Sequence, residues 1–91
     1  MDSASQMQTV LVFLEEENRL PLASELGLTT ESYAVLLEPM VTSLRFVEGV
    51  EIVKNTKGKA VDIRNTNARL TTEGRQVYEI GKLTDSSRII L

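Results

Sequence analysis

Apolar positions along the chain fall at helical spacing in its first half, and this spacing divides the first half into helices. A first helix is expected over about residues 5–18. Its apolar face consists of Met7, Val10, Leu11 and Leu14, at the spacing i, i+3, i+4, i+7. A very short helix is expected from Pro21 to Leu26, because proline tolerates the first helical position. Gly27 is then a natural stop for this short helix.

The next helix, the third in order, carries the longest apolar stripe. We expect Thr29 or Thr30 to cap it, and Glu31 in its first turn suits the helix dipole. The stripe consists of Tyr33, Leu36, Leu37, Met40 and Leu44. Pro39 lies inside the stripe, and a proline cannot donate a backbone hydrogen bond one turn back. The sequence therefore predicts a bend or a break in this helix within a turn of Glu38.

Beyond Phe46 the apolar positions alternate with polar ones, which is the pattern of β-strands. The alternating positions are Val50, Ile52, Val61 and Ile63. Residues 54–59 between them are rich in turn-forming residues, and Gly58 can adopt a positive φ. These features predict a two-stranded β-hairpin of roughly Gly49 to Arg64.

A last helix is expected from about Thr72 to Leu83, with Thr71 as its cap. Val77 and Ile80, with Leu83 as a third candidate, are expected to face inward. Residues 84–91 follow as a tail that we expect either to be flexible or to dock, on the core or on a second copy. A chain of 91 residues is short enough for a single domain, which we assign to residues 1–91.

Composition narrows the chemistry of this domain. The chain has no cysteine and no histidine, so it lacks thiolates, the commonest metal ligand and the commonest general base. It also has no glycine-rich phosphate loop and no nucleophile–base pair. We therefore expect no enzyme, no catalytic residue, no cofactor and no metal. The apolar stretch Thr9–Leu14 is far shorter than the roughly 20 residues of a membrane span, so we expect no membrane segment and no membrane partner. The lack of cysteine fits a cytoplasmic protein, which is the localisation we expect.

Three segments together resemble winged-helix proteins. Residues 22–28 (LASELGL) look like the first helix and turn of a helix-turn-helix, and residues 44–50 (LRFVEGV) look like the passage from a recognition helix into a wing strand. Residues 70–75 (LTTEGR) are similar to the junction that closes the wing in many small bacterial and archaeal winged-helix regulators. The resemblance covers about Met7 to Leu83. It implies an α+β fold with a three-helix helix-turn-helix core, a two-stranded wing and a C-terminal helix, and it implies DNA binding through the third helix with support from the wing.

Charge is divided unevenly between these expected elements. Residues 1–44 carry one cation against seven acids, whereas residues 45–91 carry nine cations against six acids, and the net charge is −3. The cations of the expected wing region are Lys54, Lys57, Lys59, Arg64 and Arg69. The expected exposed face of the third helix carries Glu31, Ser32, Val35, Glu38 and Thr42, with two carboxylates and no cation. Phosphate contact requires Lys or Arg, so we expect the wing rather than the third helix to carry DNA binding.

Two hypotheses of function remain open at this point. In the first, the protein is a small regulator that binds double-stranded DNA through a basic wing. In the second, the acidic and partly apolar face of the third helix binds a protein partner, and the wing cations only solubilise an exposed hairpin. A homodimer is compatible with both, because similar small winged-helix regulators pair through flanking helices.

Overall fold

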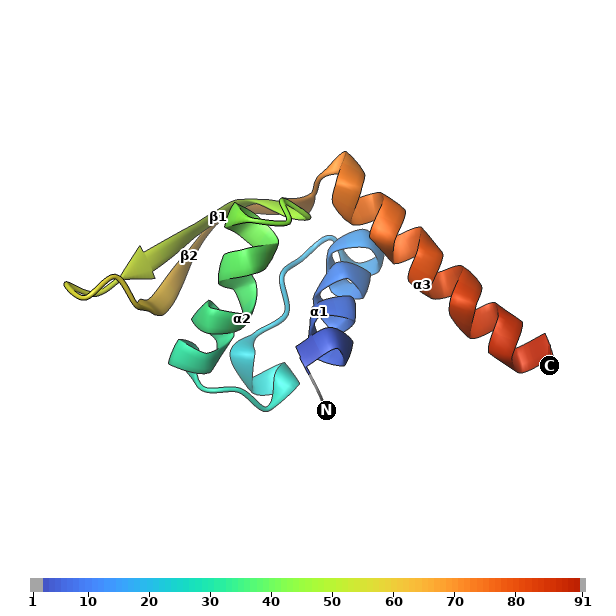
Figure 1. Ribbon diagram of the computed structural model, residues 1–91, viewed down its shortest axis with the longest axis horizontal. Coiled ribbons are helices and arrows are strands. Elements are labelled where there is room, and N and C mark those ends of the chain that lie inside the picture. The colour runs from blue at the N-terminus through green and yellow to red at the C-terminus, as the bar shows by residue number, and fades with distance from the viewer. Residues whose placement is uncertain (1–2, 91) are drawn as a thin grey trace.

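Three α-helices and one two-stranded antiparallel sheet make up the computed structural model, which describes residues 3–90 and the side chains of residues 4–81 (Figure 1). The helices are α1 (Ser3–Val12), α2 (Thr30–Thr42) and α3 (Thr72–Ile90). The strands are β1 (Val47–Lys54) and β2 (Ala60–Leu70). Two short turns, a π-helical turn (Phe13–Glu17) and a 3₁₀ turn (Ala23–Leu26), lie between α1 and α2. The predicted α+β class is therefore confirmed.

The core is formed by the facing sides of α1, α2 and the hairpin. Its most deeply buried side chains include Val10, Leu11, Leu37, Met40 and Val47. The predicted face of the first helix is confirmed, because Leu14 is also buried and Met7 packs against the same cluster. Tyr33 of α2 is buried as well, and its hydroxyl donates a hydrogen bond to the carbonyl of Pro21.

The first two helical segments begin at other residues than predicted. α1 begins at Ser3, and the π-helical turn that follows it ends at Glu17, before Asn18, which has a left-handed backbone (φ 55°). The short helix is a 3₁₀ turn that begins at Ala23, so Pro21 is not its first residue. Its start is stabilised instead by the Glu25 carboxylate, which accepts the N–H of Leu22 at 2.9 Å. Gly27 ends the turn at φ 69°, as predicted.

α2 buries most of the stripe predicted for it. Thr29 is its cap, because its Oγ1 accepts the N–H of Ser32 at 3.1 Å. The buried stripe positions are Tyr33, Leu36, Leu37 and Met40. Leu44 does not belong to the stripe: the helix ends at Thr42, and Leu44 is 44% exposed in the turn that follows.

Pro39 does not break α2, which runs as one α-helix from Thr30 to Thr42. The prediction of a break near Glu38 is wrong, because the proline removes only the one hydrogen bond to the carbonyl of Val35 and the helix continues beyond it to Thr42. The carbonyl of Glu38 accepts the Thr42 hydroxyl at 2.7 Å, and the carbonyl of Pro39 accepts the N–H of Leu44 at 2.8 Å. A bend at this position stays a prediction.

The hairpin extends further at its base than predicted. β1 begins at Val47 and β2 ends at Leu70, and these two buried residues pair with each other. The turn at its other end is as predicted, with Gly58 at φ 80°. The side chain of Asn55 holds this turn, because its Oδ1 accepts the backbone N–H groups of Lys57 and Lys59 at 2.9 and 3.0 Å.

Gly49 lies opposite a bulge near the base of the hairpin. The ladder pairs on either side of it are Glu48–Arg69 and Val50–Asn65, so Gly49 alone faces residues 66–68 of β2. Its φ is 77°, and a Cβ at this position would lie 2.0 Å from the carbonyl oxygen of Asn67. Only glycine combines this backbone with this close approach.

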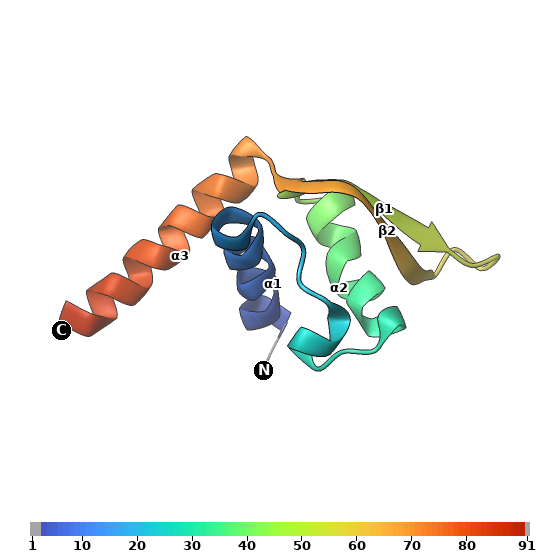
Figure 2. The same ribbon diagram turned by 180° about the vertical axis from the view of Figure 1, so that it is seen from behind.

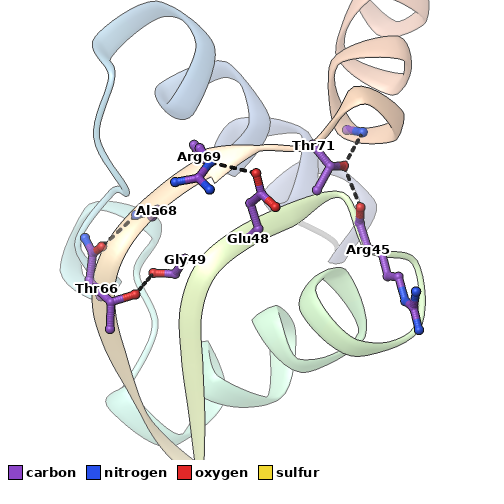
Figure 3. Close-up of polar contacts among 9 residues, drawn as sticks. Arg45, Glu48, Gly49, Thr66, Ala68, Arg69 and Thr71 are labelled. Carbon is purple, nitrogen blue, oxygen red and sulfur yellow. Dashed lines mark hydrogen bonds and ion pairs between the residues drawn. The ribbon is translucent and has the colours of Figure 1, made fainter.

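Side-chain hydrogen bonds tie the bulge and the start of α3 to β1 and to the turn before it (Figure 3). The hydroxyl of Thr66 donates to the carbonyl of Gly49 at 2.8 Å. The hydroxyl of Thr71 donates to the carbonyl of Arg45 at 2.5 Å and accepts the N–H of Gly74 at 3.0 Å. Thr71 therefore caps α3, as predicted.

α3 packs on the π-helical turn through its first residues and then extends beyond α1 (Figures 1 and 2). The buried Tyr78 donates a hydrogen bond to Glu16 at 2.8 Å, and Arg75 pairs with Glu15 at 3.3 Å. Ile80 is 63% exposed, so the prediction that it faces inward is wrong.

The last helix is longer than predicted, because α3 continues from Thr72 to Ile90. Residues 84–90 of the predicted tail thus belong to this helix. The side chain of Leu83 and the whole of Leu91 lie outside the described part of the chain, and the docking of the tail stays a prediction.

Candidate nucleic-acid interface

The hairpin that carries the predicted cations lies along α2 and projects past it (Figures 1 and 2). Two sets of contacts join the hairpin to the predicted face of α2. The Nζ of Lys54 lies 3.1 Å from Oε2 of Glu38. Lys59 lines a surface groove of about 370 Å³ together with Glu31, Ser32 and Val35 of α2. Part of each predicted set, Lys54 and Lys59 of the hairpin and Glu31, Ser32, Val35 and Glu38 of α2, therefore lies side by side.

Two of the five predicted cations form ion pairs with carboxylates. Lys54 is paired with Glu38, and Nε of Arg69 lies 2.6 Å from Oε1 of Glu48 on the neighbouring strand (Figure 3). The sequence predicted both as cations for phosphate, and in the structure each of them has an acidic partner. A ladder pair also places Arg64 opposite Glu51. Charge along the strands of the hairpin is thus mixed rather than basic.

The cations at the tip of the hairpin have no acidic partner among the described residues. Lys57 and Lys59 at the tip are exposed, as is Arg64 further along β2 opposite Glu51, and none of the three has an ion pair within the part of the chain that the structure describes. The bonds from Asn55 fix the backbone of both lysines, so the two ammonium groups emerge from a defined turn. This turn is the most cationic feature of the predicted site.

The exposed face of α2 offers acidic and apolar groups. Glu31, Ser32, Val35 and Thr42 are exposed, with Val35 at 50%, and Glu38 is half-buried. The hydroxyl of Ser32 accepts from Thr29 at 3.0 Å, and the hydroxyl of Thr42 donates to the backbone. These residues lack the donor-rich side chains that read base edges in a major groove.

One cation near this surface was missed from the sequence. Arg45 follows α2 in a left-handed backbone conformation (φ 55°), and its guanidinium points away from the strands (Figure 3). It is exposed and has no ion pair among the described residues. The sequence could have indicated Arg45, because it directly follows the predicted third helix.

Shifted pKa values lie away from this surface and reflect structural contacts. Arg19 forms two hydrogen bonds with Glu25, at 2.8 and 2.9 Å, and lowers the pKa of that carboxyl to about 2. The hydrogen bond to Glu16 raises the pKa of Tyr78 to about 12. Burial raises the pKa of Tyr33. Each shifted group thus belongs to a contact between elements of the fold.

Comparisons of the chain with family models, with curated proteins and with solved structures gave no match. No helix in the described part of the chain is long and apolar enough to span a bilayer. Among the described residues, no group of three or more acidic side chains is arranged to hold a metal ion.

Proposed function

We propose that this protein is a small cytoplasmic winged-helix protein that binds double-stranded DNA through the tip of its hairpin, as a transcriptional regulator would. In this assignment the hairpin is the wing and α2 is the recognition helix. The order of elements supports it: a helix, a short turn, a second helix, a hairpin and a final helix. The packing of the hairpin along α2 supports it as well.

The single observation that carries DNA binding is the pair of exposed lysines at the projecting tip. Lys57 and Lys59 have no acidic partner in the described residues, and the turn holds them at the end of the hairpin. The molecule as a whole has a net charge of −3 and repels phosphate. The projecting tip lets the two ammonium groups reach the DNA backbone, although Lys59 also lines the groove that contains Glu31 of α2.

This mode of binding is directed at phosphates and carries little sequence information. Contacts from lysine to the DNA backbone position a protein without reading bases. The face of α2 would contribute little, because Glu31 repels phosphate and Val35 has no hydrogen-bonding group. We therefore propose weak sequence preference and a strong dependence on salt.

Fluorescence anisotropy with a labelled duplex of about 20 base pairs, in a series of salt concentrations, tests this function. The unmodified protein should bind at low salt. The variant K57A/K59A should bind all duplexes more weakly, with a salt slope flatter by about 1.8, which corresponds to two phosphate contacts. The variant Arg75→Ala is the control. Arg75 lies on α3, away from the tip of the hairpin, and is paired with Glu15 of the π-helical turn. Absence of binding to any duplex at low salt would refute the proposal.

The groove beside α2 favours a second function, binding of a protein partner. Val35, which is 50% exposed, lines this groove together with Glu31 and Lys59. If no duplex binds, variants of Glu31 and Val35 that abolish binding of a copurified protein would support this function instead.

A further inference from the structure

We propose that Glu38 is a positioning residue that holds Lys54 against α2 and so withholds this lysine from DNA. The inference rests on the proposed function, because it concerns the number of phosphate contacts that the hairpin makes. In the absence of Glu38, the hairpin would present a third lysine beside the two at its tip.

The geometry singles out this ion pair from the others. Four ion pairs occur among the described residues, and the pair between Nζ of Lys54 and Oε2 of Glu38, at 3.1 Å, is the one that joins α2 to the hairpin. Both side chains keep access to solvent, at 48% and 31% exposure. The ammonium group of Lys54 is therefore accessible to a ligand, but it already forms an ion pair with the Glu38 carboxylate.

Lys54 is placed where a phosphate contact would add to those of the tip. It is the last residue of β1 and pairs with Ala60, which directly follows Lys59. A DNA backbone lying on Lys57 and Lys59 would thus pass close to Lys54. Two effects of Glu38 oppose contact there, since its carboxylate competes with phosphate for the ammonium group and repels the phosphate itself.

The two effects can be separated because α2 carries a second acid. Glu31 lies on the same exposed face and has no ion pair within the described part of the chain. Glu31→Gln removes one negative charge from α2 without releasing a lysine. Glu38→Gln removes the same charge and also frees Lys54. Any difference in salt dependence between the two variants is therefore due to the loss of the ion pair with Lys54.

The experiment measures DNA affinity against salt concentration for the full chain and its variants, using the duplex of the preceding section. Glu38→Gln should steepen the slope of log affinity against log salt by about 0.9, which is one phosphate contact. Glu31→Gln should raise affinity with the slope unchanged. Lys54→Ala should leave the slope of the unmodified protein unchanged, and the double variant E38Q/K54A should return to that slope. Circular dichroism of each variant checks that the fold is kept.

Two results would overturn the inference while leaving DNA binding in place. One is an equal slope for Glu38→Gln and Glu31→Gln. The other is a slope for Lys54→Ala that is as flat as that of Lys57→Ala, since Lys54 would then already touch phosphate in the unmodified protein. Absence of salt-dependent binding by both the unmodified protein and Glu38→Gln would instead overturn the proposed function, and the inference with it.

Discussion

Replacing Gly49 by alanine tests whether the bulge at the base of the hairpin is as tightly built as the structure indicates. Gly49 has φ 77°, and an added Cβ would lie 2.0 Å from the carbonyl oxygen of Asn67. Gly58 provides a matched control, because its φ is 80° and an added Cβ there meets nothing within 4 Å. Both variants therefore place alanine in a left-handed backbone, but only Gly49→Ala adds a steric overlap.

The expected magnitudes follow from this difference. A left-handed backbone costs an L-residue roughly 1–2 kcal/mol, and the stiffer unfolded chain of an alanine variant offsets about 0.4–1 kcal/mol of this cost. We therefore expect Gly58→Ala to lower the free energy of unfolding by about 1 kcal/mol. The overlap with Asn67 must be relieved by moving backbone, which adds about 1–3 kcal/mol at Gly49. Gly49→Ala should thus cost about 2–4 kcal/mol.

Urea unfolding followed by far-ultraviolet circular dichroism measures both free energies. A cost of about 2–4 kcal/mol is a large part of the roughly 5–13 kcal/mol expected for a domain of this size, so the shift in midpoint should be plain. If Gly49→Ala lowers the free energy of unfolding no more than Gly58→Ala does, the argument from close approach is refuted. The overlap with Asn67 would then add no measurable cost.

Three further predictions concern packing and pH. Leu37→Ala should lower the free energy of unfolding by about 2–5 kcal/mol in urea, because the side chain is fully buried; a cost below about 1 kcal/mol would contradict its place in the core. Tyr78→Phe should lower the urea midpoint at pH 8, and the difference from the unmodified protein should vanish as the pH rises through about 12, because the raised pKa of Tyr78 makes its contact with Glu16 stabilising only while the hydroxyl is protonated. The pKa of Glu25 is lowered to about 2, so its contact with Arg19 stabilises the fold above the ordinary carboxyl pKa and is lost as the pH falls toward 2. Glu25→Gln should therefore remove part of the acid sensitivity of the urea midpoint, and an unchanged acid profile would count against this pair.

Much of the fold could be predicted because local rules decide it. The helical spacing of Val10, Leu11 and Leu14 placed the buried face of the first helix correctly. Gly27, Gly58 and Thr71 were located as a helix stop, a turn residue and a helix cap, each from a preference that acts within a few residues.

Errors arose where a tertiary contact overrides a local rule. Pro39 was expected to bend or break α2, but the helix runs past it without a break, and Leu37 and Met40 on either side of it are fully buried. Leu44 and Ile80 fit helical stripes by spacing alone, but their side chains are 44% and 63% exposed. The bulge at Gly49 depends on a close approach between strands that spacing does not encode.

The sequence predicted which residues form the candidate site but not which of their side chains contact one another. Its cations were found by counting, and counting cannot show which of them carry acidic partners. Lys54 and Arg69 pair with Glu38 and Glu48, residues that are 16 and 21 positions away in the sequence. The structure thus narrows the unpaired cations of the predicted set to Lys57, Lys59 and Arg64 within the described residues.

The most direct test of the central claim compares two surfaces of the protein in one DNA-binding measurement. Salt-dependent anisotropy titrations should be run on the unmodified protein, on K57A/K59A and on S32A/T42A, with duplexes of several sequences. We expect K57A/K59A to weaken binding to every duplex and to flatten the salt slope by about 1.8, and we expect S32A/T42A to change neither affinity nor sequence preference. If K57A/K59A has no effect and S32A/T42A abolishes a sequence preference, α2 reads DNA in the major groove and the claim that the hairpin tip carries binding is wrong.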